Sequence, residues 1–476
     1  MVYRIRFSLS MLALTVLAGC AQTSYVRTDL DMPATWQQVT PRAAQSQQVA
    51  LAQIQGDRWW EAFGDAQLNQ LQALALERNP DLTIAGWKVR NAWLTAGNAA
   101  SNILPTLSAG GNASSSRALE GDASSTKSFG TSFGASWQLD LWGNLAAQRR
   151  QADWEAQATE QDRLATAMSL TGTVATTYWQ LALADAKISS QRQSLERANK
   201  TLQLAQVQYR AGAISGLDLA QAQQAVNQQQ ANLDALEQSR VELRHALAIL
   251  FDVSPQSLPE AAQHPRLPDM AVLPEVPVGV PADVLARRPD VRAAEMRLQA
   301  SLAHVDATRT SYYPTLSLTG ALGTSSNTLS DLLKNPIGTL GAGLTLPFLN
   351  WGTMQRNTRI SENSYEQAVV GFRKTLYTAL QDVENALSNR RQLALQYTQL
   401  QQAAQQAARV EELTGVRYRA GAVALKDWLT VQESQRSANL AVLDARYKRL
   451  SNLVTLYQSL GGTPVVNTVK QEQGAL

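Results

Sequence analysis

The sequence is poor in the residue types that most chemical sites require. Among 476 residues there are one cysteine and three histidines. A single cysteine excludes a disulfide within the chain, and the histidines, His245, His264 and His304, show no metal-ligand spacing. The net charge of +3, without a lysine and arginine cluster, argues against nucleic-acid binding. Nucleophile elbows, phosphate loops and cysteine pairs are also missing, so we expect no catalysis, no bound metal and no cofactor.

An apolar run occurs at the N-terminus. Arg4 and Arg6 precede it, and it extends from Phe7 to Ala18, which is too short to cross a bilayer as a mature helix. This pattern predicts a secretory signal peptide at residues 1–19. A membrane-anchor helix is the alternative interpretation.

The signal ends with Leu17-Ala18-Gly19-Cys20, which resembles the lipobox of bacterial lipoproteins. That modification needs a thiol to form the diacylglyceryl thioether, and small neighbours that fit the peptidase. We therefore expect Cys20 to carry a covalent lipid, with acyl chains such as palmitate. Ala21, rather than an acidic residue, follows the cysteine and favours delivery to the outer membrane. Several acyl chains or an inserted barrel would make the anchoring stable.

The remainder of the chain repeats itself. Tyr209-Arg210-Ala211-Gly212 returns as Tyr418-Arg419-Ala420-Gly421, an offset of 418 − 209 = 209. The same offset relates Pro105-Thr106-Leu107-Ser108 to Pro314-Thr315-Leu316-Ser317, Trp142-Gly143 to Trp351-Gly352, and Pro80-Asp81 to Pro289-Asp290. A shared register over this length indicates an internal duplication, with roughly 73–267 aligned on 282–476.

Each half contains a segment in which apolar and polar residues alternate. From 129 to 141 alternate positions are mostly Phe, Trp and Leu, whereas the positions between them are Gly, Ser, Gln and Asp. The second half repeats the pattern from 340 to 348, and partner strands are expected at 105–117 and 314–326. A period of two predicts β-strands with one apolar and one polar face. Each half should therefore hold one long hairpin.

A half-buried hairpin of a soluble sandwich would show the same alternation. Strands of about ten residues, with aromatic residues on the apolar face and an outer-membrane address, favour a tilted membrane crossing instead. Four strands cannot close a barrel, since the smallest barrels have about eight, and open edges are not tolerated in lipid. Several chains would therefore have to share one barrel.

Long helices are expected between the hairpins. No proline interrupts 143–211 or 352–420, and at 1.5 Å per residue each segment could reach about 100 Å. The chain then turns and returns with apolar residues spaced three and four apart, from Leu217 to near Asp252 in the first half. This spacing predicts packing of the coiled-coil type.

These motifs together resemble the outer membrane factor family, and within it the lipoprotein branch that serves tripartite drug efflux pumps. The resemblance rests on the lipobox, the paired "PTLS" hairpins, the "DLWG" and "LNWG" strand ends, "RRPDVRAAE" and the paired "YRAG" turns. It implies a mainly helical homotrimer in which 3 × 4 = 12 strands close one transmembrane β-barrel, continued by a long periplasmic α-helical barrel. The outer-membrane location, with the chain extending into the periplasm, follows from the same resemblance.

The function implied is an exit duct that passively conducts drugs or other small toxic compounds. A periplasmic adaptor would link it to an inner-membrane transporter and open its periplasmic end. The same architecture also serves type I secretion of polypeptides, which stays open as an alternative. A purely structural coiled-coil lipoprotein is a third possibility, but it does not explain the alternating strands.

The resemblance also implies roles for the paired turns. The adaptor-docking tips would contain Tyr209, Arg210, Gly212, Arg419 and Gly421. A periplasmic gate would contain Asp218, Asp427, Tyr418 and Thr430, with three Asp427 carboxylates forming an anionic ring and Asp218 sharing an inter-helix network with Tyr418. Glycine suits the turns because it accepts positive φ without steric cost.

Two departures from the family pattern suggest a gate with fewer polar links. Thr430 stands where a second aspartate is expected, and Val423 stands where an arginine partner is expected. Asp218 and Asp427 also have a simpler interpretation as first-turn helix acids, each stabilised by the helix dipole by about 0.3–1 kcal/mol. The two interpretations are compatible.

The expected organisation can be stated by residue ranges. It comprises a signal peptide (1–19), a lipidated arm (20–65), a first repeat (66–267) with a hairpin at about 103–141 and a tip at about 209–217, a Pro-rich connector (268–281), a second repeat (282–464) with a hairpin at about 312–349 and a tip at about 418–426, and a tail (465–476).

Overall fold

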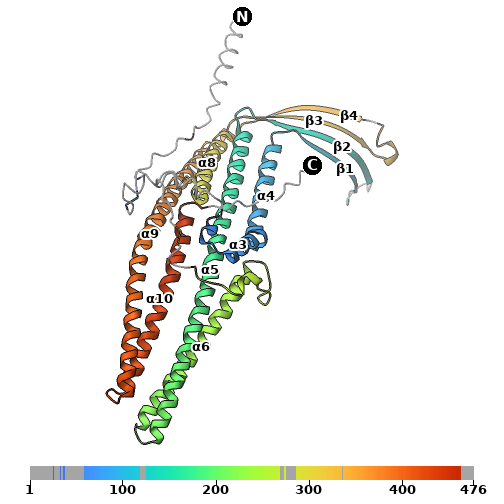
Figure 1. The fold of residues 1–476 in the computed structure, drawn as a ribbon. Helices are drawn as coiled ribbons and strands as arrows, with labels where there is room; N and C mark the ends of the chain where they lie inside the picture. The colour runs from blue at the N-terminus through green and yellow to red at the C-terminus, as the bar shows by residue number, and fades with distance from the viewer. Residues whose placement is uncertain are drawn as a thin grey trace. The chain divides into compact units, whose positions relative to one another are not determined.

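The computed structural model is mainly helical, with one four-stranded antiparallel sheet, as the sequence predicts (Figure 1). It describes residues 25, 33, 36–37, 58–117, 119, 125–268, 273–274, 286–334 and 336–462. The predicted signal peptide, Cys20, most of the arm, most of the connector and the predicted tail lie outside these residues. Among the described helices, none combines the length and the apolar character needed to cross a membrane.

The two halves of the chain share a succession of one helix, two strands, a long helix and a return helix, which confirms the duplication. The first half forms η1 (Trp59–Phe63), α3 (Ala66–Arg78), α4 (Pro80–Ser101), β1 (Thr106–Arg117), β2 (Ser125–Leu139), α5 (Asn144–Arg210), α6 (Gly216–Ile249) and η2 (Glu260–Ala262). The second half forms α8 (Pro289–Thr310), β3 (Thr315–Ser326), η4 (Leu329–Asp331), β4 (Pro336–Thr345), η5 (Pro347–Leu349), α9 (Trp351–Arg419) and α10 (Leu425–Ser459).

The chain divides into two compact units, and each unit draws on both halves. Among the described residues, the first unit includes those within Trp87–Gln161 and Arg292–Thr375. The second unit includes those within Asp31–Gly86, Asp162–Val291 and Leu376–Leu476. The sequence repeat therefore does not correspond to two separate domains.

The sheet lies in the first unit, with the strands in the order β1-β2-β3-β4 (Figure 1). Phe133 of β2 lies opposite Ala109 of β1 and Leu322 of β3, and directly opposed side chains share one face of a sheet. That face is apolar and exposed: Leu107 is 83% exposed and Leu340 is 93% exposed. The predicted alternation is thus present in three dimensions.

The opposite face of the sheet is polar and rich in glycine. Glycine lies directly opposite a polar side chain at several places; Gly134 faces Ser108 and Gly341 faces Thr319. A Cβ added at Gly134 would lie 2.7 Å from Ser108 Oγ, and one at Gly341 would lie 2.8 Å from Thr319 Oγ1. These glycines leave room for the polar side chains directly opposite them.

Two strands end earlier than the alternation predicts. We expected Leu141 and Phe348 on the apolar face, but β2 ends at Leu139 and β4 ends at Thr345. Proline has no N–H to donate to a neighbouring strand, so Pro347 does not continue β4 and instead begins the 3-10 turn η5. Asp140 instead caps α5: its carboxylate oxygens accept hydrogen bonds from the N–H groups of residues 145 and 146, at 3.0 and 2.8 Å.

The second unit has a large aromatic core, here called the base cluster, which includes Trp59, Phe63, Trp179 and Tyr457. Trp59 stacks on Tyr457 with ring centroids 5.3 Å apart, and Phe63 lies 4.8 Å from Trp179. The cluster joins η1 and α3 to α5, α6, α9 and α10. It holds the helices together at the end of the unit away from the turns that follow α5 and α9.

Candidate functional site at the helix tips

The predicted tips are the turns that join α5 to α6 and α9 to α10, visible as two helical hairpins in Figure 1. Gly212 and Gly421 have φ of 73° and 72°, in the left-handed region. In the first turn Gly212 N–H donates to Tyr209 O at 3.0 Å, and Ala213 N–H donates to Gln208 O at 2.8 Å. The second turn repeats both bonds at 2.9 Å. This pair of bonds defines the Schellman motif, in which glycine ends a helix.

The first return helix begins with a complete capping box. Ser215 Oγ accepts a hydrogen bond from Asp218 N–H at 3.2 Å, and Asp218 Oδ2 accepts from Ser215 N–H at 3.0 Å and from Ser215 Oγ at 2.7 Å. These hydrogen bonds lower the pKa of Asp218. Asp218 therefore acts as a helix cap, which is one of its two predicted roles.

The second return helix lacks this cap. Ala424 occupies the N-cap position of α10, so no side-chain oxygen can bond the first-turn N–H groups. Asp427 is exposed, and its carboxylate makes no hydrogen bond or ion pair within the described part of the chain. Thr430 is also exposed and donates to Lys426 O of its own helix at 2.9 Å. Asp427 thus has an exposed side chain at the second tip, and its place in a charged ring stays a prediction.

The two tips pack against each other through a small hydrophobic core, here called the tip cluster. Its buried members are Leu202, Ala205, Ala222, Tyr418, Leu425 and Trp428. Tyr418 stacks on Trp428 with ring centroids 4.9 Å apart. A Cβ on Gly415 would lie 3.0 Å from Trp428 Nε1, so this glycine makes space for the indole. Trp428 Nε1 donates to Glu411 Oε1 at 3.0 Å.

The hydrogen-bond partner of Tyr418 differs from the prediction. Its hydroxyl donates to Gln208 Oε1 at 2.8 Å, whereas the carboxylate of Asp218 accepts its hydrogen bonds from Ser215. Burial, followed by the negative charge of Asp218, raises the pKa of Tyr418. Asp218 therefore acts on Tyr418 through its charge, and Gln208 supplies the link between the hairpins.

The remaining tip residues lie on the outside. Tyr209 occupies the position equivalent to Tyr418 but is 47% exposed, against 7% for Tyr418. Arg210 and Arg419 are exposed as well, and Arg210 Nε donates to Gln206 O at 3.3 Å. The tips thus present aromatic and basic side chains on their exposed surface.

Sequence reasoning missed Gln208, Gly415 and Trp428. The offset of 209 places Leu219 opposite Trp428, and this change from leucine to tryptophan could have indicated a larger core at the second tip. No cluster of three or more metal-ligating side chains occurs within the described ranges. The site is a closed contact between two helical hairpins.

Comparison with known proteins agrees with this architecture. The model of the family described as "Outer membrane efflux protein" matches residues 71–251 and 280–462. Toxin and drug export protein A of Aggregatibacter actinomycetemcomitans is 30% identical over 459 residues, covering 96% of this chain and 98% of that protein. The pyoverdine export outer membrane protein OpmQ of Pseudomonas putida is 33% identical over 464 residues, covering 95% of this chain and 96% of that protein.

Solved structures show the same fold. The open state of the MtrE outer membrane channel of Neisseria gonorrhoeae has a TM-score of 0.77 and 28% identity, covering 94% of this chain and 99% of that chain. Because the family model matches both halves of the chain and the relatives match nearly its full length, the chain belongs to the outer membrane efflux protein family, whose members are channels and not enzymes.

Proposed function

We propose that the protein is the outer-membrane exit duct of a tripartite efflux system and conducts its cargo passively. The main support for this proposal is the four-stranded sheet. Its exposed apolar face suits lipid, and its glycine-rich polar face suits the crowded inner side of a curved wall. Strands β1 and β4 are the two edges of the sheet, and a lipid environment requires that both be paired.

Three copies would satisfy the two edges by pairing β1 of one chain with β4 of the next. The resulting 3 × 4 = 12 strands would close one barrel around the polar face. The long helices α5 and α9, of 67 and 69 residues, would continue the duct into the periplasm. This arrangement leaves no unpaired strand in the membrane.

The helix tips would meet the rest of the pump. The exposed Tyr209, Arg210 and Arg419 surround the glycine turns and are suited to contact a periplasmic adaptor, which in turn binds an inner-membrane transporter. A lipid on Cys20 would add a second anchor to the outer membrane. The tip cluster and the Tyr418–Gln208 bond would keep the duct closed until a partner docks.

The cargo proposed is small toxic compounds, because the relatives include proteins named for export of drugs, pyoverdine and cations. Export of a polypeptide is the second candidate, since one of these relatives is also named for a toxin. Drug susceptibility and secretion assays in a deletion strain separate the two. Loss of the protein should raise susceptibility without changing the set of secreted polypeptides.

Single-channel conductance of the purified full-length trimer in a planar bilayer tests the duct. We expect a small, cation-preferring conductance that loses its cation preference in Asp427→Ala, because the exposed Asp427 carboxylates would form the ring at the mouth. Asp234→Ala, which removes an exposed acid farther along α6, is the matched control and should leave selectivity unchanged. Failure of the trimer to insert would contradict the barrel, and equal selectivity in all three proteins would contradict the ring.

A further inference from the structure

A cavity of about 350 Å³ lies within the second unit, between α5, α6 and α10. Pockets that hold small ligands enclose about 300–1,000 Å³, so one small molecule fits here. Its lining residues include three cations, Arg197, Lys426 and Arg436, and one carboxylate, Glu433, which leaves a net charge of +2. We call this space the basic cavity. Its charge favours an anion.

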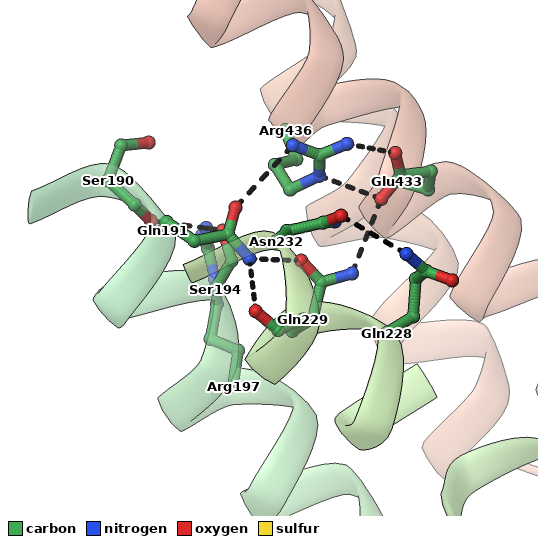
Figure 2. Close-up of polar contacts among 9 residues, drawn as sticks. All are labelled: Ser190, Gln191, Ser194, Arg197, Gln228, Gln229, Asn232, Glu433 and Arg436. Atoms are coloured by element: carbon green, nitrogen blue, oxygen red, sulfur yellow. Dashed lines mark hydrogen bonds and ion pairs between the residues drawn. The ribbon is translucent and has the colours of Figure 1, made fainter. Parts of the chain in front are cut away.

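Glu433 does not balance the other cations of the basic cavity, because it is already paired with Arg436 (Figure 2). Arg436 Nε donates to Glu433 Oε2 at 2.8 Å, and a second hydrogen bond joins Arg436 Nη2 to Glu433 Oε1. These bonds lower the pKa of Glu433, so its carboxylate stays charged and held by Arg436. The charge that remains in the cavity is therefore that of Arg197 and Lys426.

Arg197 is a half-buried guanidinium without a carboxylate partner. Its Nη1 lies 3.4 Å from Gln435 Oε1, and its Nη2 lies 3.4 Å from Ser194 Oγ. Good N–H···O bonds are about 2.9 Å long, so both contacts are weak. Neither Arg197 nor Lys426 forms an ion pair within the described part of the chain. A guanidinium that is partly withdrawn from water gains from a counter-ion, and Arg197 has donors to offer one.

Glutamine side chains complete the lining. Gln221 and Gln224 of α6 face the basic cavity, and their amides make no hydrogen bond within the described residues, so each keeps two N–H donors. Glu411 of α9 lies 3.5 Å from a third lining residue, Gln432, but it does not line the cavity and accepts from Trp428 Nε1 at 3.0 Å. The lining thus combines unpaired cations with free amide donors.

We propose that the basic cavity binds a small molecule that carries an oxyanion, either a carboxylate or a phosphate, on the Arg197 guanidinium. The planar N–H groups of arginine match two oxygens of either anion. Lys426 adds a second positive charge, and the amides of Gln221 and Gln224 bond the remaining oxygens. The ligand contacts α5, α6 and α10 together and therefore stabilises the second unit. The proposal does not rest on the duct function.

Calorimetric titration of the full-length protein in lipid nanodiscs tests the site, with inorganic phosphate and succinate as separate probes at constant ionic strength. We expect saturable binding of at least one probe, at one site per chain, and the probe that binds identifies the source of the oxyanion. Arg197→Gln should weaken this binding about tenfold or more. Arg192→Gln is the matched control and should leave it unchanged, because Arg192 of α5 is exposed, pairs with Glu237 at 2.8 Å and does not line the cavity.

Two further variants test the sign of the charge. Lys426→Gln changes an exposed side chain and should weaken binding without affecting folding, whereas Glu433→Gln removes the carboxylate and should strengthen binding. A bound probe should also raise the unfolding temperature of the unmodified protein. No saturable binding of either probe would overturn the proposal. So would equal losses in Arg197→Gln and Arg192→Gln, or weaker binding in Glu433→Gln.

Discussion

Asn79 and Arg288 make the same connection in the two halves of the chain. They are separated by the repeat offset, 288 − 79 = 209, and each precedes the proline that begins a helix, α4 or α8. Asn79 Nδ2 donates to Leu250 O at 3.0 Å, and Arg288 Nη1 donates to Ser459 O at 3.5 Å. The acceptors are also one offset apart, 459 − 250 = 209. Each residue thus ties a helix start to the end of a return helix.

Replacing Arg288 with alanine should destabilise the second unit. The side chain is buried, donates to Asp290 at 2.8 and 3.0 Å, and reaches Asp382 at 3.1 Å. Hydrogen bonds to charged groups contribute about 1.5–3 kcal/mol, and we expect a loss in the free energy of unfolding of this size. Denaturant unfolding at fixed trimer concentration measures it. Arg192→Ala, which removes an exposed ion pair, should cost no more than about 1 kcal/mol.

The ion pairs of Arg288 with Asp290 and Asp382 should make the free energy of unfolding depend on pH. Burial would raise the pKa of Asp290, but the hydrogen bonds and charge of Arg288 outweigh it, so the pKa is lowered. A carboxyl group with a lowered pKa stabilises the fold above its unfolded pKa of about 3.9 and loses that contribution as pH falls through the folded pKa. Unfolding measured from pH 5 downward should show this loss. In Arg288→Ala the loss should be smaller, and an unchanged acid profile would argue against the pairing.

The tip glycines should resist substitution by alanine. Gly212 and Gly421 have open space around the missing Cβ, so the cost arises from their positive φ alone. A left-handed conformation costs an L-residue about 1–2 kcal/mol, and we expect each variant to unfold its tip more readily by that amount. Hydrogen exchange of the tip amides measures the change. Gly371→Ala, in the interior of α9 with equally open space, should instead stabilise by about 0.5–1 kcal/mol.

Tyr418→Phe should favour the open state of the duct. The change removes the bond to Gln208 but keeps the ring stacked on Trp428. Without this hydrogen bond the closed state should be less stable by about 0.5–1.5 kcal/mol, which would raise the open population by up to about tenfold. Open probability in single-channel recordings measures it. Tyr209→Phe is the control from the other half, since the exposed Tyr209 hydroxyl makes no hydrogen bond within the described residues; a similar rise there would exclude a specific role for Tyr418.

The sequence by itself determined the duplication, the element types and the turns. An offset of 209 and a period-two pattern are properties of a linear chain, as are long segments without proline. A glycine before a return helix likewise predicts a turn from local backbone preference alone. These features depend on neighbours in sequence, so they could be predicted without knowing what packs against them.

Tertiary packing decided the features that differ between equivalent positions. Tyr209 and Tyr418 share one motif, yet only Tyr418 is buried, because Trp428 replaces Leu219 and Gly415 leaves room for it. The partner of Tyr418 is Gln208 rather than Asp218, and Gln229 of α6 contacts Glu433 of α10, which is distant in sequence (Figure 2). Contacts of this kind depend on distances between segments more than 200 positions apart, which a local pattern does not encode.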